Sequence, residues 1–502
     1  MNAADPRPTP VREPEGPARP RRLFDRDDEW AALTAFAQDP KSGPGLCVVS
    51  GRPRQGKTLL LEALARATGG FYFSGQEATE ADSLRRLGEE YARYRRAAAP
   101  SRWPDWKHAV DELLALGDTR PLPVVIDAFP DLVEASPALP SVIHGALRRL
   151  AGPARQNRTR LVLGGETAPV MSRLFAGSPL RSIAELELRI QPLDFRAAAR
   201  LWGIEDPALA LRVHAVVGGT PAYRYDYVND DVPRGPEDFD DWVCRTVLNP
   251  RTPLFREARH LVDEETGHGS HGACHSALAA LASGCTTHGE IAAYTGQQLT
   301  DASRALALLR DHGLLLSQPD GLRPGLVRHR IADPLLAFEH AVVRPRRTAL
   351  ESEEAGAVWR SARADFSRIA EDCFAQICRH WAEHFAAPAT FGGAPVTAAY
   401  GSLGSDPDSP EAHAAEVVVR GHDGQGPTRL LSIGLARLGA DMDVEHLRRL
   451  HRLVDAVAAA GEDTGRVRPA LYGGRGFSPE LHAAQDRGEV MLVDLDRLYR
   501  GH

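Results

Sequence analysis

Leu46-Cys-Val-Val-Ser50 runs directly into Gly51-Arg-Pro-Arg-Gln-Gly56-Lys57-Thr58. The first run is short and apolar, which predicts a buried strand. The second is a complete GxxxxGK[ST] pattern, and the residues from Lys57 to Thr68 have the spacing of the helix it should open. Such a loop turns successive N–H groups toward phosphates, its lysine reaches the β- and γ-phosphates, and its Thr hydroxyl binds Mg²⁺. We therefore expect Mg²⁺ and ATP to be bound by Gly51, Arg52, Pro53, Arg54, Gln55, Gly56, Lys57, Thr58 and Leu59.

A second apolar run, Val124-Val125-Ile126-Asp127, ends in a carboxylate. A strand-end acid beside a phosphate loop orients Mg²⁺, usually through water. We expect Asp127 to do so together with Thr58, which makes Lys57 and Asp127 the first candidates for catalytic residues. The alternative is an ordinary strand-end Asp that caps the following turn.

Strands alternate with helices around these two motifs. Alternation of this kind predicts an α/β domain with a parallel sheet covered on both faces. The expected strands are 46–50, 71–73, 123–127, 160–164 and 186–190, and the expected helices are 28–37, 57–68 and 81–96.

The pattern changes after about residue 195. Residues 195–265 have a helical pattern, and residues 276–340 have a helix, a turn, a helix and two short strands. We expect the helices of this turn at 288–294 and 300–312, the second capped by Thr300 or Asp301, with Arg304 and Arg310 exposed. A helix at 363–383 precedes a further α/β segment that runs to Leu498. The expected division is a disordered 1–22, a P-loop domain 23–195, a helical lid 196–270, a winged helix 271–347 and an α/β domain 360–502.

Composition limits the classes of function. The chain has 502 residues, 43% hydrophobic and 25% charged, with 60 basic and 67 acidic side chains and a net charge of −7. This balance is that of an ordinary globular protein and excludes a generic polyanion binder, while it leaves room for a local basic face. Only Lys41, Lys57 and Lys107 are lysines, and the arginine bias is typical of a GC-rich bacterial genome.

Several features favour a cytoplasmic protein. The six cysteines are scattered without a CxxC pair, which indicates reduced thiols. Residues 1–22 have no apolar core of a secretory signal, and no apolar run approaches the ~20 residues of a membrane helix. His268, His271 and His275 have a spacing that could hold a metal, but we interpret their Gly-rich surroundings as a flexible linker.

These motifs together resemble the archaeal-type P-loop ATPases of the AAA+/STAND class, which carry a winged helix and a restriction-endonuclease-like C-terminal domain. The resemblance covers most of residues 23–498. It rests on the P-loop and on five further boxes at matching order and spacing: Phe24-Asp-Arg-Asp-Asp-Glu29, Val125-Ile-Asp-Ala-Phe-Pro-Asp-Leu132, Gly218-Gly-Thr-Pro-Ala-Tyr223, Leu254-Phe-Arg-Glu257 and Ile331-Ala-Asp-Pro-Leu-Leu-Ala-Phe338.

The chain departs from this family at two catalytic positions. The family places a Glu after the strand-end Asp to position the attacking water, and here that residue is Ala128. It also places an Arg three residues after Leu180, where this chain has Ile183, with Arg181 nearby. Loss of a positioned base costs ~10²–10⁴ in rate, so the resemblance implies slow or absent hydrolysis. Glu166, after the fourth strand, is a candidate substitute base, with a solvated loop acid as the alternative.

The family's nuclease-like domain holds Mg²⁺ with carboxylates and a lysine. Glu371 matches the first acid, but Val stands where the Asp-bearing strand needs its acid, with Glu416 beside it, and Leu435 and Arg437 replace Glu and Lys. Leu and Val offer no oxygen ligands. The resemblance therefore implies a degenerate nuclease fold, and we interpret Glu371 as an exposed helical acid.

Three hypotheses follow from the sequence. The first is a nucleotide-dependent switch that holds Mg·ATP at the loop and Asp127. The second is an active ATPase coupled to DNA through the winged helix, with a substitute base. The third is a protein-interaction scaffold with structural nucleotide. A protein partner or a homo-oligomer fits the first and the third, and none requires a membrane.

Overall fold

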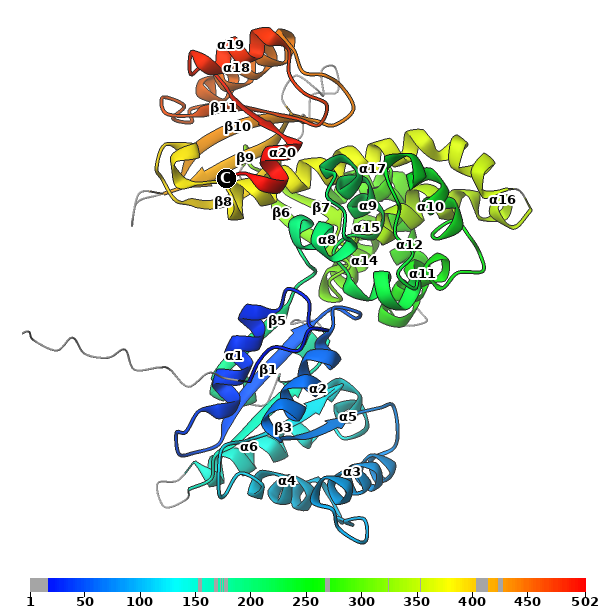
Figure 1. Cartoon of the computed structure of the whole chain (residues 1–502), viewed down its shortest axis with the longest axis vertical. Helices are drawn as coiled ribbons and strands as arrows, with labels where there is room; N and C mark the ends of the chain where they lie inside the picture. Colours follow the sequence, from blue (N-terminus) through cyan, green and yellow to red (C-terminus); the bar gives the residue numbers. More distant parts are fainter. Residues whose placement is uncertain are drawn as a thin grey trace, which may run out of the picture. The chain divides into compact units, whose positions relative to one another are not determined.

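The computed structural model describes residues 17–151, 156–166, 170–171, 173, 175, 179–266, 271–323, 325–352, 354–402, 414–422 and 428–502, and the side chains of 264–266 are excluded. Most of the expected disordered segment 1–22, His268, and most of the loop residues 401–413 and 421–428 lie outside this part of the chain. The chain divides into two compact units, Met1–Gln191 and Pro192–His502, called here the first and the second unit (Figure 1).

The first unit is built on a five-stranded sheet in the order β2-β3-β4-β1-β5, in which every neighbouring pair is parallel. This confirms the predicted parallel α/β fold. The strands are β1 (Gly45–Gly51), β2 (Phe71–Ser74), β3 (Leu122–Asp127), β4 (Thr159–Gly164) and β5 (Leu186–Ile190). The helices are α1 (Asp27–Gln38), α2 (Lys57–Thr68), α3 (Glu80–Arg95), α4 (Trp106–Ala115), α5 (Phe129–Ala135) and α6 (Leu139–Leu150).

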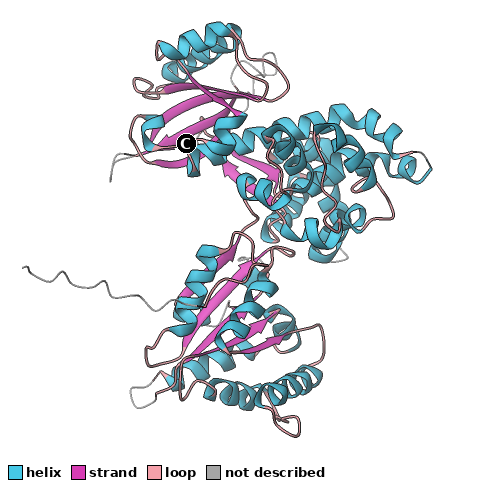
Figure 2. Cartoon of the chain, viewed as in Figure 1, coloured by secondary structure: helices cyan, strands magenta, loops and turns pink. Residues whose placement is uncertain are grey.

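Both faces of this sheet are covered by helices (Figure 2). The inner strands are buried along their whole length because alternate side chains enter two different cores. Val125 faces a core that includes residues of α1 and α2, whereas Val124 and Ile126 face one that includes residues of α3, α4 and α6. The sheet is thereby fixed between two helical layers, and the carboxyl ends of its strands meet at one edge.

The second unit begins with helices, as the pattern of residues 195–265 predicted. They are α8 (Phe195–Trp202), α9 (Pro207–Val217), the short turns η2 (Tyr223–Tyr227) and η3 (Pro236–Asp238), α10 (Phe239–Arg245) and α11 (Pro253–Thr266). Asp194 and Asp206 cap α8 and α9, since their carboxylates accept backbone N–H groups of the first turns.

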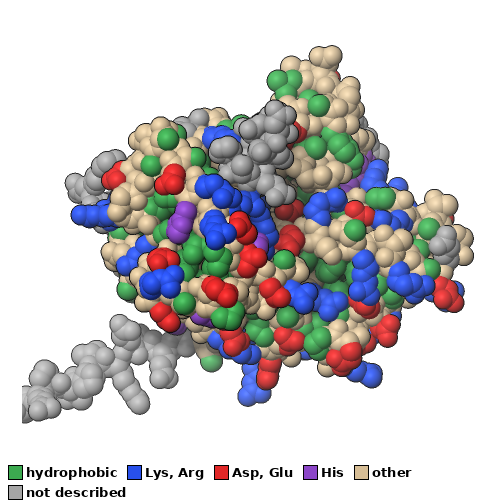
Figure 3. All heavy atoms as spheres, turned by 90° about the horizontal axis from the view of Figure 1, so that it is seen from above, with side chains coloured by type: hydrophobic (Ala, Val, Ile, Leu, Met, Phe, Trp, Pro, Cys, Tyr) green, Lys and Arg blue, Asp and Glu red, His purple; other side chains and the backbone are tan. Residues whose placement is uncertain are grey.

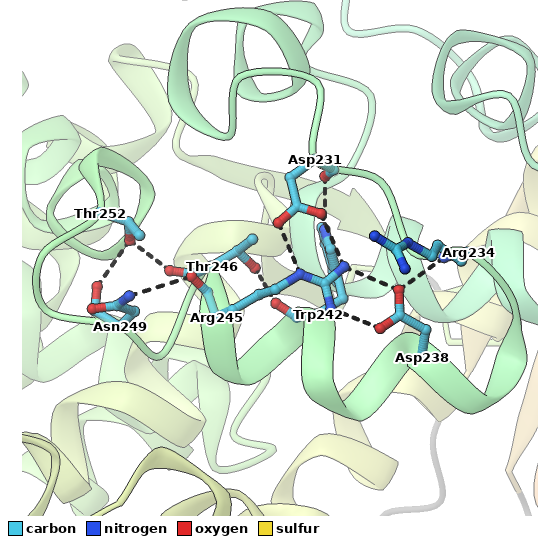
Figure 4. Close-up of polar contacts among 8 residues, drawn as sticks. All are labelled: Asp231, Arg234, Asp238, Trp242, Arg245, Thr246, Asn249 and Thr252. Carbon is cyan, nitrogen blue, oxygen red and sulfur yellow. Dashed lines mark hydrogen bonds and ion pairs between the residues drawn. The ribbon is translucent and has the colours of Figure 1, made fainter.

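An arginine between two acids ties this helical part together (Figure 4). Arg245 on α10 forms ion pairs with Asp231 at 2.8 Å and Asp238 at 2.7 Å. Trp242, one turn before it, donates its indole N–H to the Asp231 carbonyl at 2.9 Å. The loop before α10 is therefore held to the helix by both side-chain and backbone bonds.

The Gly218-Gly219 pair lies where two segments approach closely. Gly218 has φ +61°, and a Cβ added at Gly219 would lie 1.8 Å from the Leu193 carbonyl oxygen. Leu193 in turn donates its N–H to the Gly219 carbonyl at 2.9 Å. Tyr223 is buried with its hydroxyl 3.5 Å from Asp333, which caps the next short helix. The box Gly218–Tyr223 therefore contacts the box Ile331–Phe338 in the folded chain.

The segment with the expected helix-turn-helix folds as α12 (His271–Ala282), α13 (His288–Thr295) and α14 (Leu299–Asp311), followed by the antiparallel hairpin β6 (Leu315–Pro319) and β7 (Val327–Ile331). One expectation was wrong. The residue that precedes α14 is Gln298, which makes no side-chain cap, because the helix begins one residue earlier than predicted. Thr300 and Asp301 therefore lie inside its first turn and do not cap it.

The remainder contains α15 (Pro334–Phe338), η4 (Glu339–Val343), η5 (Arg344–Arg346), α16 (Arg347–Ser352) and α17 (Ala355–His384). Helix α17 begins eight residues before the predicted start, since Val358 and Trp359 are buried and extend its apolar face. A five-stranded mixed sheet follows in the order β12-β11-β10-β9-β8, with β8, β9 and β10 antiparallel and β10, β11 and β12 parallel.

The strands of this mixed sheet are β8 (Val396–Ser402), β9 (Ala415–Gly421), β10 (Arg429–Arg437), β11 (Arg468–Gly473) and β12 (Met491–Asp494). Its helices are α18 (Val444–Ala459), α19 (Pro479–Asp486) and α20 (Leu495–Arg500). The sheet fits the further α/β domain that the sequence predicted. None of the helices in the described ranges is both long and apolar enough to cross a membrane.

Candidate phosphate-binding site

The loop between β1 and α2 is shaped by residues in unusual backbone conformations. Gly56, directly before α2, has φ +86°, and Arg54 has φ +63°. A Cβ at Gly51 would lie 2.6 Å from the Ile190 carbonyl oxygen of β5, so only glycine fits there. The loop therefore curls back on itself at the carboxyl edge of the sheet.

Lys57 holds this curl in place. Its ammonium donates to the carbonyl oxygens of Gly51 at 2.7 Å and Arg52 at 2.8 Å. The two acceptors are uncharged, so a phosphate oxygen would be a stronger partner for the same ammonium. The ammonium group of Lys57 is thus held against the backbone of the loop.

The start of α2 is open to an anion. Gly56 precedes the helix without a side-chain cap, and no acidic residue occurs in the first turn. The first N–H groups of a helix have no partner within it and carry the positive end of its dipole. Thr58 and Leu59 lie exposed in this first turn, Leu59 to 39%.

Asp127 is buried at the end of β3 and is held by two donors. Its Oδ1 accepts the N–H of Ala128 at 2.9 Å, and its Oδ2 accepts the hydroxyl of Tyr72 at 3.2 Å. Burial, and then the negative charge of Asp127, raise the pKa of Tyr72, so its hydroxyl stays protonated. A Cβ at Gly164 would lie 2.6 Å from Asp127 Oδ1, so this glycine makes the room that the carboxylate occupies.

Ala128 follows in a strained conformation. Its φ is +48°, in the left-handed region, where it precedes α5 without a side-chain cap. Outside glycine this region costs roughly 1–2 kcal/mol. The chain therefore makes a tight turn directly after Asp127, and the side chain at this turn is a methyl group.

Glu166 lies beside the loop. Its carbonyl oxygen accepts the N–H of Gly51 at 2.9 Å, and the residue is half-buried. Arg181 forms an ion pair with Glu187 at 3.3 Å, and Ile183 is half-buried against the first unit's core.

Sequence reasoning did not assign site roles to Arg26 and Tyr72. Arg26 is 7% exposed, and its guanidinium donates to the carbonyl of Gln191 at 2.8 Å and to that of Gln55 in the loop at 3.4 Å. Glu29 forms an ion pair with it at 3.1 Å. Arg26, from the box Phe24–Glu29, is therefore hydrogen-bonded to the loop between β1 and α2.

The second unit brings Glu371, Glu416 and Arg437 into one neighbourhood. The carboxylate of Glu371 accepts the N–H groups of Leu438 at 2.9 Å and Gly439 at 2.7 Å, and Glu416 pairs with Arg437 at 2.8 Å. The interpretation of Glu371 as an exposed acid was therefore wrong, because it anchors the end of β10.

No protein-family model matches the chain, and no curated protein sequence matches it.

Solved structures of other proteins are similar to this chain at low sequence identity. A Walker-type ATPase of Pyrococcus abyssi is 16% identical, covering 65% of this chain and 99% of that one, with a TM-score of 0.46. The ORC2 protein of Aeropyrum pernix is 14% identical, covering 70% and 97%, with a TM-score of 0.41. The ORC1 protein of the same organism, in complex with DNA, is 16% identical, covering 65% and 94%, with a TM-score of 0.33. Likenesses of this size identify neither a family nor a function.

Proposed function

We propose that this protein binds Mg·ATP at residues 51–59 and Asp127 and acts as a nucleotide-dependent switch that hydrolyses ATP slowly or not at all. The observation that carries the proposal is the arrangement of Lys57 over the loop, with Ala128 directly after Asp127. The first supports binding, and the second removes the usual base.

The donor set fits a triphosphate with its metal. The curled loop, the uncapped start of α2 and the Lys57 ammonium provide donors for phosphate oxygens. Thr58 and Asp127 provide the oxygen atoms that Mg²⁺ prefers. Magnesium, when bound, would neutralise charge between the β- and γ-phosphates. Arg26 would hold the Gln55 segment of the loop in position.

Hydrolysis requires a group that orients the attacking water. At Ala128 the side chain has no oxygen, and the buried carboxylate of Asp127 is already held by Ala128 N–H and Tyr72. Without a positioned base the rate falls by ~10²–10⁴. Bound ATP would then persist, which suits a nucleotide-dependent switch better than an active ATPase.

The test measures Mg·ATP binding and hydrolysis side by side in the wild type and in the Lys57→Ala, Ala128→Glu and Ala128→Gln variants. We expect Mg²⁺-dependent binding with negligible turnover in the wild type, loss of binding in Lys57→Ala, and a gain of turnover in Ala128→Glu alone. Ala128→Gln is the matched control, since it adds the same length without a base. Normal turnover in the wild type would overturn the switch.

An active ATPase coupled to DNA is the second candidate, because Glu166 directly adjoins Gly51. Glu166→Gln would then abolish turnover. On the DNA side, the proposed winged helix exposes Arg304 and Arg310, but Arg304 pairs with Asp301 at 2.9 Å. Both basic and acidic side chains are spread over the face drawn in Figure 3. Salt-sensitive duplex binding that Arg304→Glu weakens would favour this candidate.

In the same proposal, residues 196–270 form a helical lid, residues 271–347 a winged helix and residues 360–502 a degenerate nuclease-like domain. The proposed location of the protein is the cytoplasm. A scaffold with structural nucleotide is the third candidate. It differs from the switch in two readouts, since ATP would change neither the oligomeric state nor the protease sensitivity of a scaffold. Light scattering and limited proteolysis, each with and without Mg·ATP, distinguish the two.

A further inference from the structure

A hollow of about 740 Å³ opens in the second unit, and none of the described residues that line it belongs to the loop 51–59. Three guanidinium groups, two imidazoles and one carboxylate line its described wall, contributed by Arg259, Asp263, His271, His275, Arg344 and Arg347. They come from α11, α12, η5 and α16, so the fold gathers them from segments far apart in sequence. His271 and His275 lie in α12, and the interpretation of these two as part of a flexible linker was therefore wrong.

The positive charges in this hollow are only partly neutralised. Asp263 pairs with Arg259 at 3.4 Å, and Glu339, which is buried, pairs with Arg347 at 2.5 Å. Arg344 is exposed and forms no ion pair with a residue of the described chain. The Glu339 carboxylate also interacts electrostatically with Arg344 and Arg259, so an anion that enters the hollow meets three guanidinium groups against two carboxylates, Asp263 and Glu339.

The histidines add charge that depends on pH. His340 donates its Nδ1–H to the Leu336 carbonyl at 3.0 Å, and burial lowers its pKa to about 3, so its Nε2 is a bare acceptor. His275 Nδ1, at 3.1 Å, must therefore carry the proton that it donates to His340. The Nε2 of His275 lies 3.6 Å from Asp263 and is the atom that takes up a second proton.

We propose that this hollow binds a small phosphorylated molecule, with the phosphate dianion held by Arg259, Arg344 and Arg347. Guanidinium groups pair with phosphate oxygens in a bidentate way, and these three come from different elements around the hollow. An adjoining hollow of about 420 Å³ shares Arg259, Asp263 and Arg347 and adds Pro250, Phe255, Arg256 and His260 to its wall. Free phosphate would fill only part of this space, and the exposed ring of Pro250, beside the largely buried Phe255, offers an apolar surface to the remainder of a phosphoester.

A metal site does not account for the same residues. Asp263 Oδ1 lies 3.6 Å from both His271 Nδ1 and His275 Nε2, and no group of three metal-ligating side chains occurs among the residues that the structure describes. The surplus of arginine also opposes a cation. The charge and the donor set thus favour an anion.

The test uses calorimetry with inorganic phosphate and phenyl phosphate as probes, in a Lys57→Ala background that removes phosphate binding at the loop. We expect phenyl phosphate to bind about tenfold more tightly than inorganic phosphate, and Arg344→Gln to weaken both about tenfold. Arg304→Gln, an exposed arginine outside the hollow, is the matched control and should change neither. Because the background lacks Lys57, failure here is independent of the proposed ATP site.

Two further readouts separate a binding role from damage to the fold. Asp263→Asn should tighten binding, because it removes the carboxylate that faces the anion. Sulfate, whose charge is constant over the range, should bind more tightly at pH 5.5 than at pH 8. Burial, and then the charge of Arg344, lower the pKa of His275, with Asp263 opposing and Arg259 adding to the shift, so its second proton is taken up only toward acid pH. His271, His340, Arg347 and Glu339 are the other titratable or charged groups around it.

Absence of phosphate binding, or binding that Arg344→Gln leaves unchanged, would overturn the proposal. Equal affinity for the two probes would overturn the assignment to a phosphoester, since the apolar wall would then contribute nothing.

Discussion

The hydroxyl of Tyr72 on β2 donates to Asp127 Oδ2 on β3, 55 positions later in the chain, at 3.2 Å. The parallel pairing of these strands sets Tyr72 opposite Val125, two residues before the carboxylate. One oxygen of the proposed Mg²⁺ partner is thus already oriented by a phenol.

Tyr72→Phe should therefore reduce the free energy of unfolding by about 1 kcal/mol, the net value of one hydrogen bond. It should also weaken the Mg²⁺ dependence of ATP binding, because Asp127 loses one of its two positioning donors. A magnesium titration at fixed ATP measures the second effect. Tyr94→Phe is the control, since its hydroxyl donates to the Gly69 carbonyl. An equal loss of Mg²⁺ dependence in both variants would contradict the positioning role.

Ala128→Gly should stabilise the first unit by about 0.5–1 kcal/mol, because glycine adopts φ +48° without the penalty of a Cβ. Denaturant unfolding measures the change. Ala31→Gly, at an exposed position inside α1, should have the opposite sign and a similar size. If both variants destabilise the protein alike, Ala128 is not strained.

Gly219→Ala should destabilise the second unit by about 1–3 kcal/mol or more, because its Cβ would lie 1.8 Å from the Leu193 carbonyl oxygen and force the two segments apart. Gly289→Ala, inside α13, has no atom within 4 Å of the new Cβ and should be neutral or stabilising. Thermal unfolding of the two variants distinguishes a steric effect from a general intolerance of alanine.

Arg245→Gln and Asp238→Asn should show a coupling of about 0.5–1 kcal/mol in a double-mutant cycle at pH 7, as expected for a partly exposed ion pair. The hydrogen bond from Arg245 lowers the pKa of Asp238 below its ordinary value of 3.8. The coupling should therefore be complete above about pH 4 and decline as the pH falls through the folded pKa. A coupling independent of pH would mean that the carboxylate charge is not involved.

Acid should destabilise the second unit selectively. Burial lowers the pKa of His214, His329 and His380 to about 4 and that of His340 to about 3, whereas the unfolded value is 6.5. The unfolded chain thus takes up protons below pH 6.5 that the folded unit refuses, and for His340 the loss at pH 5 is about 2 kcal/mol.

The first unit contains only His108 and His144, neither of them buried. Hydrogen exchange at pH 7 and pH 5, corrected for intrinsic rates, should show protection lost in residues 192–502 first. His340→Gln should reduce this sensitivity, and His144→Gln should not change it. Simultaneous loss in both units would refute the assignment.

The parts of the fold that the sequence predicted well are those that local patterns determine. The apolar run before Gly51 and the Gly-rich loop predicted β1, α2 and the loop between them, because these three features depend on contiguous residues. The start of α17 was missed because Gly356 weakens the helical pattern there, and only the tertiary burial of Val358 and Trp359 extends the helix.

Contacts between distant segments could not be predicted. Tyr72 meets Asp127 only because β2 is the neighbour of β3 in the sheet, and strand order is a tertiary property. The hollow lined by Arg344 joins residues that no spacing connects. The role of Glu371 was misjudged for the same reason, since its partners Leu438 and Gly439 lie more than 60 residues away.

The scarcity of lysine, together with the bonds that Lys57 makes to Gly51 and Arg52, has a practical consequence for chemical footprinting. The side chains of Lys41 and Lys107 are 81% and 61% exposed, whereas Lys57 is half-buried with its amine engaged by two carbonyls. An acylating reagent therefore has three lysine targets in the whole chain, of which two serve as internal references. Occupancy of the loop becomes readable as the ratio of one labelled peptide to two others.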